Sequence, residues 1–139
     1  MKVDGGCHCG NLTYEAEIDE SKITLCHCTD CQTLAGTAFR MSAYSYQNSF
    51  TLLMGEHKEY VKIGGSGNPR IQAFCPVCGT QIYSTSVGDG PKVYNIRTGT
   101  IRQRDKLVPM RQVWNRSALP WLDDLSSIPK FDEAVPQPR

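Results

Sequence analysis

Seven cysteines are the residues of this chain best suited to chemistry, and they fall into three tight groups. The groups are Cys7 and Cys9; Cys26, Cys28 and Cys31; and Cys75 and Cys78. Scattered inert cysteines would not cluster in this way. Their odd number and the lack of an apolar signal region at the start of the chain argue against a disulfide framework. Clustered thiolates favour a soft metal, with zinc as the first candidate.

The spacing predicts two zinc sites that use all seven cysteines. Cys26, Cys28 and Cys31 lie within six residues and can surround one ion. A two-plus-two set then remains, consisting of Cys7, Cys9, Cys75 and Cys78. Four thiolates form a closed structural site, whereas three leave an exchangeable position of the kind found in catalytic zinc. A competing division builds one four-cysteine site from another combination and leaves three thiols idle.

The segment from Cys75 to Gly79 is typical of a zinc knuckle. Pro76 sets the φ of a turn, and Gly79 can adopt the positive φ that lets backbone N–H groups approach the sulfurs. The histidines are weaker ligand candidates. Strand alternation points His8 and His27 away from the flanking cysteines, so we expect both in packing or supporting roles, and His57 lies in a polar, solvated stretch.

Three thiolates around Zn²⁺ carry a net charge of −1, which weakens the ion as a Lewis acid. Strong activation of water is therefore not expected, and binding of a further soft ligand is. A thiol in the open position would be held as its thiolate, which suits chemistry on thiol adducts. A zinc deaminase needs a Glu two residues after its first ligand, and Cys7-His8-Cys9 and Cys26-His27-Cys28 lack one.

Short segments of alternating polarity, bounded by Gly, Pro, Asn and Ser, predict an all-β fold that holds these cysteines in place. The expected strands are 12–18, 59–63, 71–74, 81–84, 92–96 and 110–114. A short helix is expected over 30–35, ended by Gly36. We expect antiparallel strands in two packed sheets, with turns at 64–69 and 88–91. The Pro-containing tail, residues 123–139, is expected to be poorly ordered.

The chain has 139 residues, which fits a single domain over 1–139, and its hydrophobic fraction of 40% and charged fraction of 21% are ordinary for a soluble protein. No apolar run approaches the length of a membrane span. The formal net charge of +1 makes a nucleic-acid partner unexpected. A cytoplasmic location follows from the absence of a signal region.

The chain resembles the glutathione-dependent formaldehyde-activating family over about residues 3–122. The resemblance rests mainly on the stretches 6–10, 26–31 and 74–80, with weaker support from Gly99-Thr100, Pro109 and Pro120-Trp121. It implies a tent-like all-β fold with two Zn²⁺ ions, divided among the cysteines as above. It also implies condensation of glutathione with formaldehyde, a carbon–sulfur lyase reaction in reverse, with Cys26, Cys28 and Cys31 holding the catalytic zinc.

Two positions depart from the family pattern. The family often has Leu-Asp where this chain has Ile101-Arg102, and often has His where this chain has Gln112. Both departures are expected to alter the substrate pocket.

The leading hypothesis is a zinc-dependent carbon–sulfur lyase or synthase, acting on a glutathione-type adduct of a small carbonyl compound. Carboxylates of such a substrate need cationic partners. The candidates are Arg40, Arg70, Arg97, Arg102 and Arg104. The alternative is a non-enzymatic zinc scaffold that binds a protein or nucleic acid through a basic run. That run comprises Arg97, Arg102, Arg104, Lys106, Arg111 and Arg116. The sequence does not fix the oligomeric state.

Overall fold

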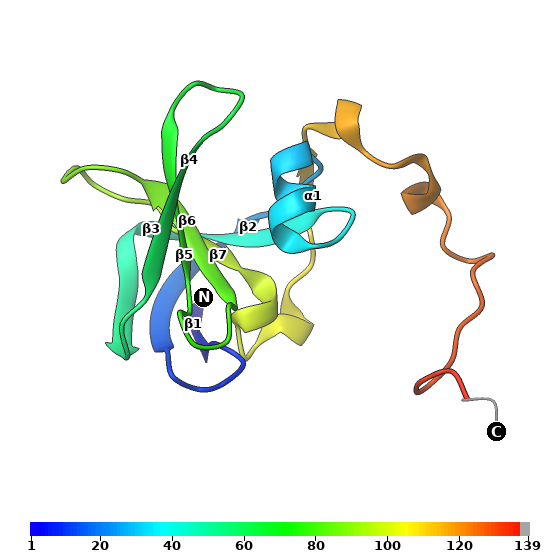
Figure 1. Cartoon of the computed structure of the whole chain (residues 1–139), viewed down its shortest axis with the longest axis horizontal. Helices are drawn as coiled ribbons and strands as arrows, with labels where there is room; N and C mark the ends of the chain where they lie inside the picture. Colours follow the sequence, from blue (N-terminus) through cyan, green and yellow to red (C-terminus); the bar gives the residue numbers. More distant parts are fainter. Residues whose placement is uncertain (137–139) are drawn as a thin grey trace.

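The computed structural model describes residues 1–136 and is dominated by antiparallel strands (Figure 1). The strands are β1 (Lys2–Gly6), β2 (Thr13–Cys26), β3 (Arg40–Met54), β4 (Lys58–Ile63), β5 (Pro69–Phe74), β6 (Gln81–Ser86), β7 (Asn95–Arg97) and β8 (Arg111–Val113). The helical elements are α1 (Thr29–Ala35) and the single 3₁₀ turns η1 (Thr98–Thr100), η2 (Arg104–Lys106), η3 (Asn115–Ser117) and η4 (Pro120–Asp123). The all-β prediction is confirmed.

All eight strands belong to one hydrogen-bonded sheet, with the path β1-β2-β3-β7-β6-β5-β4. The two sheets expected from the sequence are therefore two parts of a single sheet. The long β3 joins them, because it pairs with β2 along most of its length and with β7 near its start. One strand pair departs from the antiparallel pattern, since β8 runs parallel to the end of β2.

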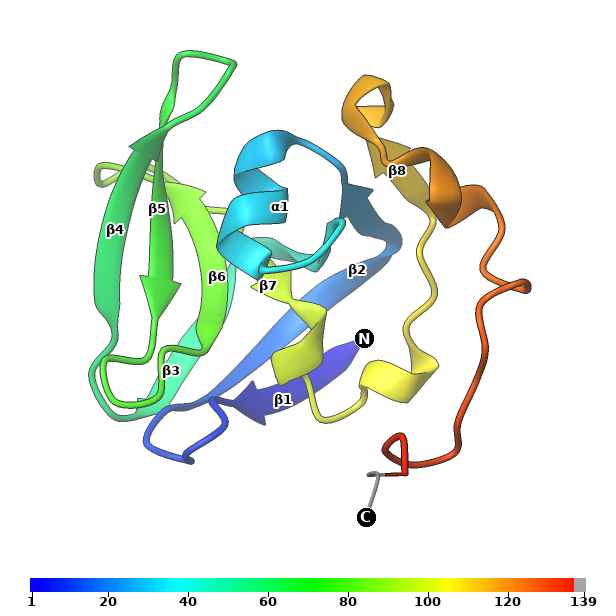
Figure 2. The same cartoon turned by 45° about the vertical axis from the view of Figure 1, so that its right-hand side comes forward.

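Both parts of the sheet contribute to one hydrophobic core, so the sheet wraps around it (Figure 2). Tyr14 and Ile18 of β2, Ile82 of β6 and Ile96 of β7 are almost completely buried in that core. The alternation that predicted β2 reflects this arrangement, because its apolar residues face inward and the intervening glutamates face solvent.

Bulges adapt the long β2–β3 pair to this curvature. The register shifts between Ala16 and Ile18 and again between Ile18 and Ile23. Such irregularities bend a strand and increase its twist, which brings the far end of β2 toward β8 and α1.

The sequence predictions for the other elements are largely confirmed. The helix begins one residue earlier than expected and ends at Gly36, whose φ of 68° closes the C-terminus through its N–H. The strand expected over 92–96 is shorter, because only its last part pairs with β3 and β6. Strands β1 and β3 were not predicted. Of the tail at 123–139, residues 137–139 lie outside the described residues. No helix within residues 1–136 has both the length and the apolar character that a membrane crossing requires.

Candidate metal centres

The seven cysteine sulfurs gather in two groups. The four-cysteine group is Cys7, Cys9, Cys75 and Cys78, and the three-cysteine group is Cys26, Cys28 and Cys31. Within each group, the sulfurs all lie within 4.8 Å of one another. The groups have the same membership as the two sets read from the sequence spacing.

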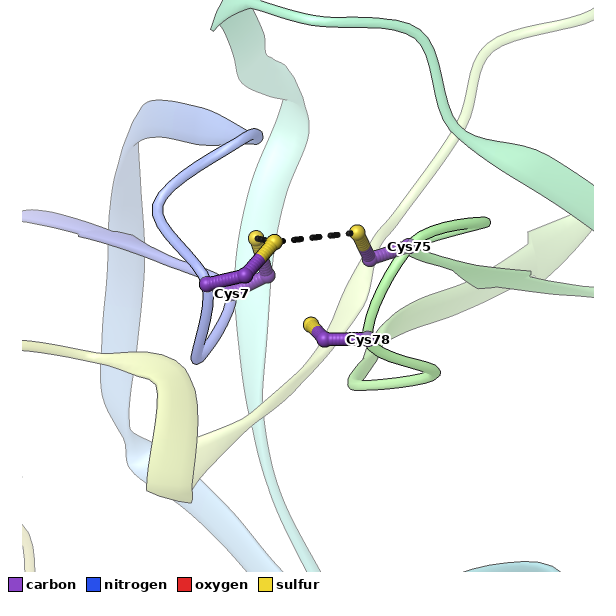
Figure 3. A group of neighbouring side chains, drawn as sticks. Cys7, Cys75 and Cys78 are labelled. Atoms are coloured by element: carbon purple, nitrogen blue, oxygen red, sulfur yellow. Dashed lines mark hydrogen bonds between the residues drawn. The ribbon is translucent and has the colours of Figure 1, made fainter.

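The four-cysteine group joins segments that are far apart in the sequence. Cys7 and Cys9 lie in the loop after β1, whereas Cys75 and Cys78 lie in the turn between β5 and β6. In Figure 3, Cys7 on the first segment faces Cys75 and Cys78 on the second. The sulfur of Cys9 is 3.6 Å from that of Cys7 and 3.8 Å from that of Cys75. Ligands at ~2.3 Å around a tetrahedral zinc ion lie ~3.8 Å apart, so these distances fit zinc ligation.

Backbone groups support the sulfurs of this group. The Leu12 N–H lies 3.2 Å from Cys7 Sγ, and the Val77 N–H lies 3.4 Å from Cys75 Sγ. Gly79 has a φ of 78° and donates its N–H to the Cys75 carbonyl at 2.9 Å, which closes the predicted knuckle turn. A hydrogen bond from the Thr80 hydroxyl lowers the pKa of the Cys78 thiol to about 5, so this ligand ionises readily.

The three-cysteine group is built where β2 passes into α1. Cys26 is the last residue of β2, and Cys28 caps the helix by accepting a hydrogen bond from the Cys31 N–H at 3.2 Å. Cys31 follows one helical turn later and is buried. A hydrogen bond from the Cys31 thiol lowers the pKa of Cys26, and the same bond raises the pKa of Cys31. A single short segment therefore supplies all three sulfurs.

His27 lies between two of these cysteines but contacts other residues. Its Nε2 is 2.7 Å from Oε1 of Gln112, which can only accept, so Nε2 carries the proton and donates. The ring is 2% exposed and meets Phe39 edge-on. These contacts agree with the packing role expected from strand alternation. His8 is exposed, and His57 lies 3.0 Å from Glu59 and 3.3 Å from the Tyr83 hydroxyl.

A polar cavity of about 190 Å³ opens beside the three-cysteine group. Its wall includes Cys26, Cys28 and Cys31 together with polar residues from the strands and Trp114. The cationic residues in this wall are Arg40, Arg70, Arg97 and Lys62. No aspartate or glutamate lines the cavity among the described residues. The cavity therefore favours an anionic or electron-rich ligand.

The five arginines proposed as partners of substrate carboxylates lie in two different places. Arg40, Arg70 and Arg97 line the cavity just described. Arg102 instead forms a bidentate ion pair with Asp4 at 2.8 and 3.0 Å, and Arg104 contacts the Ile101 carbonyl at 3.5 Å. Both lie near Cys7, in the wall of a different cavity. The sequence alone could not show which of these arginines line the cavity, because their positions depend on which strands pair.

The residues at the two departures from the family pattern do not line this cavity, and their expected effect on the substrate pocket stays a prediction. Ile101 is completely buried and bridges to Gly5, and Arg102 is held by Asp4. Gln112 accepts the hydrogen bond of His27 and acts on the site only through that ring. These substitutions therefore affect packing and support around the centres and do not form the wall of the cavity.

Trp114 is a wall residue that the sequence did not single out. It has a φ of 54°, uncommon for a residue with a side chain, and its ring stacks with the Arg116 guanidinium at 4.9 Å. Gly65 lies against the same ring, because a Cβ there would approach it to 3.2 Å. The left-handed turn of Trp114 has no sequence signal, since Gly and Asn are the usual residues for it.

Comparisons with known proteins agree with this description. A family model described as glutathione-dependent formaldehyde-activating enzyme matches residues 2–117. A crystal structure of a Rhodobacter sphaeroides protein is similar with a TM-score of 0.58 at 19% sequence identity, covering 78% of this chain and 98% of that one. At this identity the likeness concerns the fold alone. No curated protein matches the chain.

Proposed function

The chain belongs to the glutathione-dependent formaldehyde-activating enzyme family, and we propose that it catalyses carbon–sulfur bond formation or cleavage between a glutathione-type thiol and a small carbonyl compound such as formaldehyde. The observation that carries this proposal is the cationic cavity beside the three-cysteine group. That group has one sulfur fewer than a closed tetrahedral zinc site needs.

The donor chemistry of both groups fits zinc. In the proposed arrangement, Cys7, Cys9, Cys75 and Cys78 hold a structural ion, and Cys26, Cys28 and Cys31 hold a second ion. The second ion would supply an exchangeable position that binds an incoming thiol as its thiolate. A small-molecule thiol, with glutathione as substrate or co-substrate, is the partner this chemistry suits.

Arg40 has a direct role in this scheme. Arg40 pairs directly across from Cys26 in the β2–β3 ladder, so its charge lies beside the sulfurs and favours an anionic substrate sulfur over a neutral thiol. In the forward direction, the substrate sulfur forms a bond to the carbonyl carbon, and the carbonyl electron pair becomes an alkoxide that takes a proton from water. Cleavage reverses these steps.

The alternative of a scaffold that binds through a basic run has little support from the fold. Arg97 is 9% exposed and faces the cavity, and Arg102 is paired with Asp4. Arg111 donates to Thr24 and stacks on Tyr44. The run therefore does not form one continuous exposed cationic surface.

An exchange experiment tests the proposed activity. Glutathione and formaldehyde interconvert spontaneously with S-hydroxymethylglutathione, and nuclear magnetic resonance exchange spectroscopy measures that rate. The zinc-loaded protein is expected to accelerate the exchange, and Cys31→Ser is expected to lose the acceleration while keeping its β-sheet circular dichroism. An exchange rate equal to the spontaneous one with fully loaded protein would reject the glutathione–formaldehyde assignment.

A further inference from the structure

Two buried guanidinium groups share one neutral acceptor at the inner end of the cavity. Arg40 Nη1 and Arg97 Nη2 each donate to Oε1 of Gln72 at 2.9 Å. Arg97 Nη1 also donates to Ser42 Oγ at 2.8 Å. Arg40 is 6% exposed, Arg97 9% and Gln72 4%. Three different strands thus place two positive charges around a single amide oxygen.

These two side chains have unused donors. Arg40 Nε, Arg40 Nη2 and Arg97 Nε are buried and have no hydrogen-bond partner among the described residues. Burial, together with the nearby charge of Arg40, lowers the pKa of Arg97 to about 9, and the group remains cationic at neutral pH. Buried charges are normally paired, and buried donors are normally satisfied. The unmet donors indicate a ligand with an anionic oxygen.

The charge balance of the cavity gives the charge of that ligand. Arg40, Arg70 and Arg97 contribute three positive charges, while Lys62 is engaged by Asp30 at 3.1 Å. Three thiolates around Zn²⁺ contribute a net −1. A substrate thiolate would add a second negative charge and leave one guanidinium unbalanced. A thiolate that also carries one carboxylate would balance the cavity.

We propose that the Arg40–Gln72–Arg97 cluster is a carboxylate subsite, so that the substrate is a thiol carboxylate held at its sulfur and at its carboxylate. This inference rests on the proposed function, because it places the sulfur at the three-cysteine centre. Planar guanidinium groups offer paired N–H donors that match the two oxygens of a carboxylate. Arg70 is half-buried and donates a long hydrogen bond of 3.4 Å to Ser84 Oγ. It is the third arginine in the wall of the cavity.

The volume of the cavity restricts what enters it. About 190 Å³ equals roughly six water molecules at ~30 Å³ each, less than the ~300 Å³ at which drug-sized ligand pockets begin. A short mercapto acid fits entirely. Glutathione would place its thiol and its glycine carboxylate here and extend its γ-glutamyl end outward. Arg70 also lines two neighbouring hollows, so the cavity is continuous at this residue with further space on the surface.

The test compares two thiols that differ only in their carboxylate, and glutathione is measured beside them. Binding of 3-mercaptopropionate, its uncharged amide and glutathione to the zinc-loaded protein is measured by isothermal titration calorimetry. We expect the acid to bind about tenfold or more tightly than the amide, because charged hydrogen bonds are stronger than neutral ones. Comparison of the acid with glutathione then shows whether the short thiol or the peptide is preferred.

Substitutions of single arginines test which residue causes the preference for the acid over the amide. Arg97→Met is expected to remove the preference for the acid over the amide and to leave the amide affinity and the zinc content unchanged. Arg70→Met, at a less buried position, provides a second variant if Arg97→Met does not fold. Arg104→Met is the matched control, because Arg104 lies outside the cavity. Equal affinities of the acid and the amide for the wild-type protein would overturn the carboxylate subsite alone. Failure of every thiol to bind would overturn both this inference and the proposed function.

Discussion

The four-cysteine group makes a sharp prediction about stability, tested best at Cys9. Cys9 is exposed, so Cys9→Ser removes no buried packing. Its sulfur nevertheless lies within 3.8 Å of the buried Cys75 sulfur, 66 residues further along the chain. Any large loss of stability in this variant must therefore come from the lost link between these segments and not from a cavity.

The size of the loss follows from the length of the closed loop. For a cross-link over 66 residues, the chain-entropy relation gives about 4 kcal/mol at 25 °C. The same relation gives about 2 kcal/mol for Cys26 and Cys31, whose numbers differ by five. A domain of this size loses about 4 °C in Tm for each kcal/mol. Full loss of the four-cysteine link should therefore lower Tm by about 15 °C, which is the limit that Cys9→Ser approaches, and full loss of the three-cysteine link should lower it by about half as much.

Urea denaturation of the zinc-loaded proteins, followed by circular dichroism, measures these differences. Cys75→Ser should lose at least as much free energy of unfolding as Cys9→Ser, because both break the same metal link and Cys75 is also buried. Wild-type protein treated with a strong chelator should be less stable than zinc-loaded Cys9→Ser, because both metal links are then lost. The reasoning is refuted if Cys9→Ser unfolds within 1 kcal/mol of the wild type, or if Cys31→Ser is the less stable of the two variants.

Three further predictions concern the metal ions and the knuckle turn. Elemental analysis of protein purified under reducing conditions should give two zinc ions per chain; one zinc with three freely titrating thiols would reject the division of the cysteines. A mild chelator should remove the zinc of the three-cysteine group first, with little change in far-UV circular dichroism, and simultaneous loss of both ions would contradict this order. Gly79→Ala should cost about 1 kcal/mol, because Gly79 has a φ of 78° and a Cβ there meets no other atom, so strain is the only effect. Gly90→Ala, equally unobstructed and without a positive φ, is the control and should raise the free energy of unfolding by up to about 1 kcal/mol, because alanine restricts the unfolded chain.

Local patterns were enough to predict much of the fold and the grouping of the cysteines. The alternation in β2 matches its burial, whereas β4 is exposed almost throughout and the four middle residues of β6 are all buried. Gly36 and Gly79 adopt the positive φ values that their positions in the sequence suggested. The cysteine groups could be predicted because a tetrahedral metal site needs close ligands, which short spacings along the chain supply, although only Cys26 of the seven cysteines lies in a strand.

Local patterns did not predict β1, β3 or the Arg40–Gln72–Arg97 cluster. β1 contains two consecutive glycines, and the Gly5 backbone packs so closely that a Cβ would lie 2.0 Å from the Thr100 carbonyl oxygen. β3 carries several polar residues in its middle that face solvent and weaken the alternation. The pairing of Arg40 and Arg97 on Gln72 depends on the register of three strands, which local patterns do not specify.

The central claim is that the three-cysteine centre binds a thiol directly, and cobalt substitution tests it most directly. Co²⁺ placed selectively in that centre reports its ligands through thiolate-to-metal absorption. Saturating glutathione is expected to change this absorption toward that of a four-thiolate centre. We expect 3-mercaptopropionate to do the same and Cys31→Ser to abolish the response. A spectrum that stays unchanged at saturating thiol would contradict the account, because it would mean that the chain itself supplies the fourth ligand.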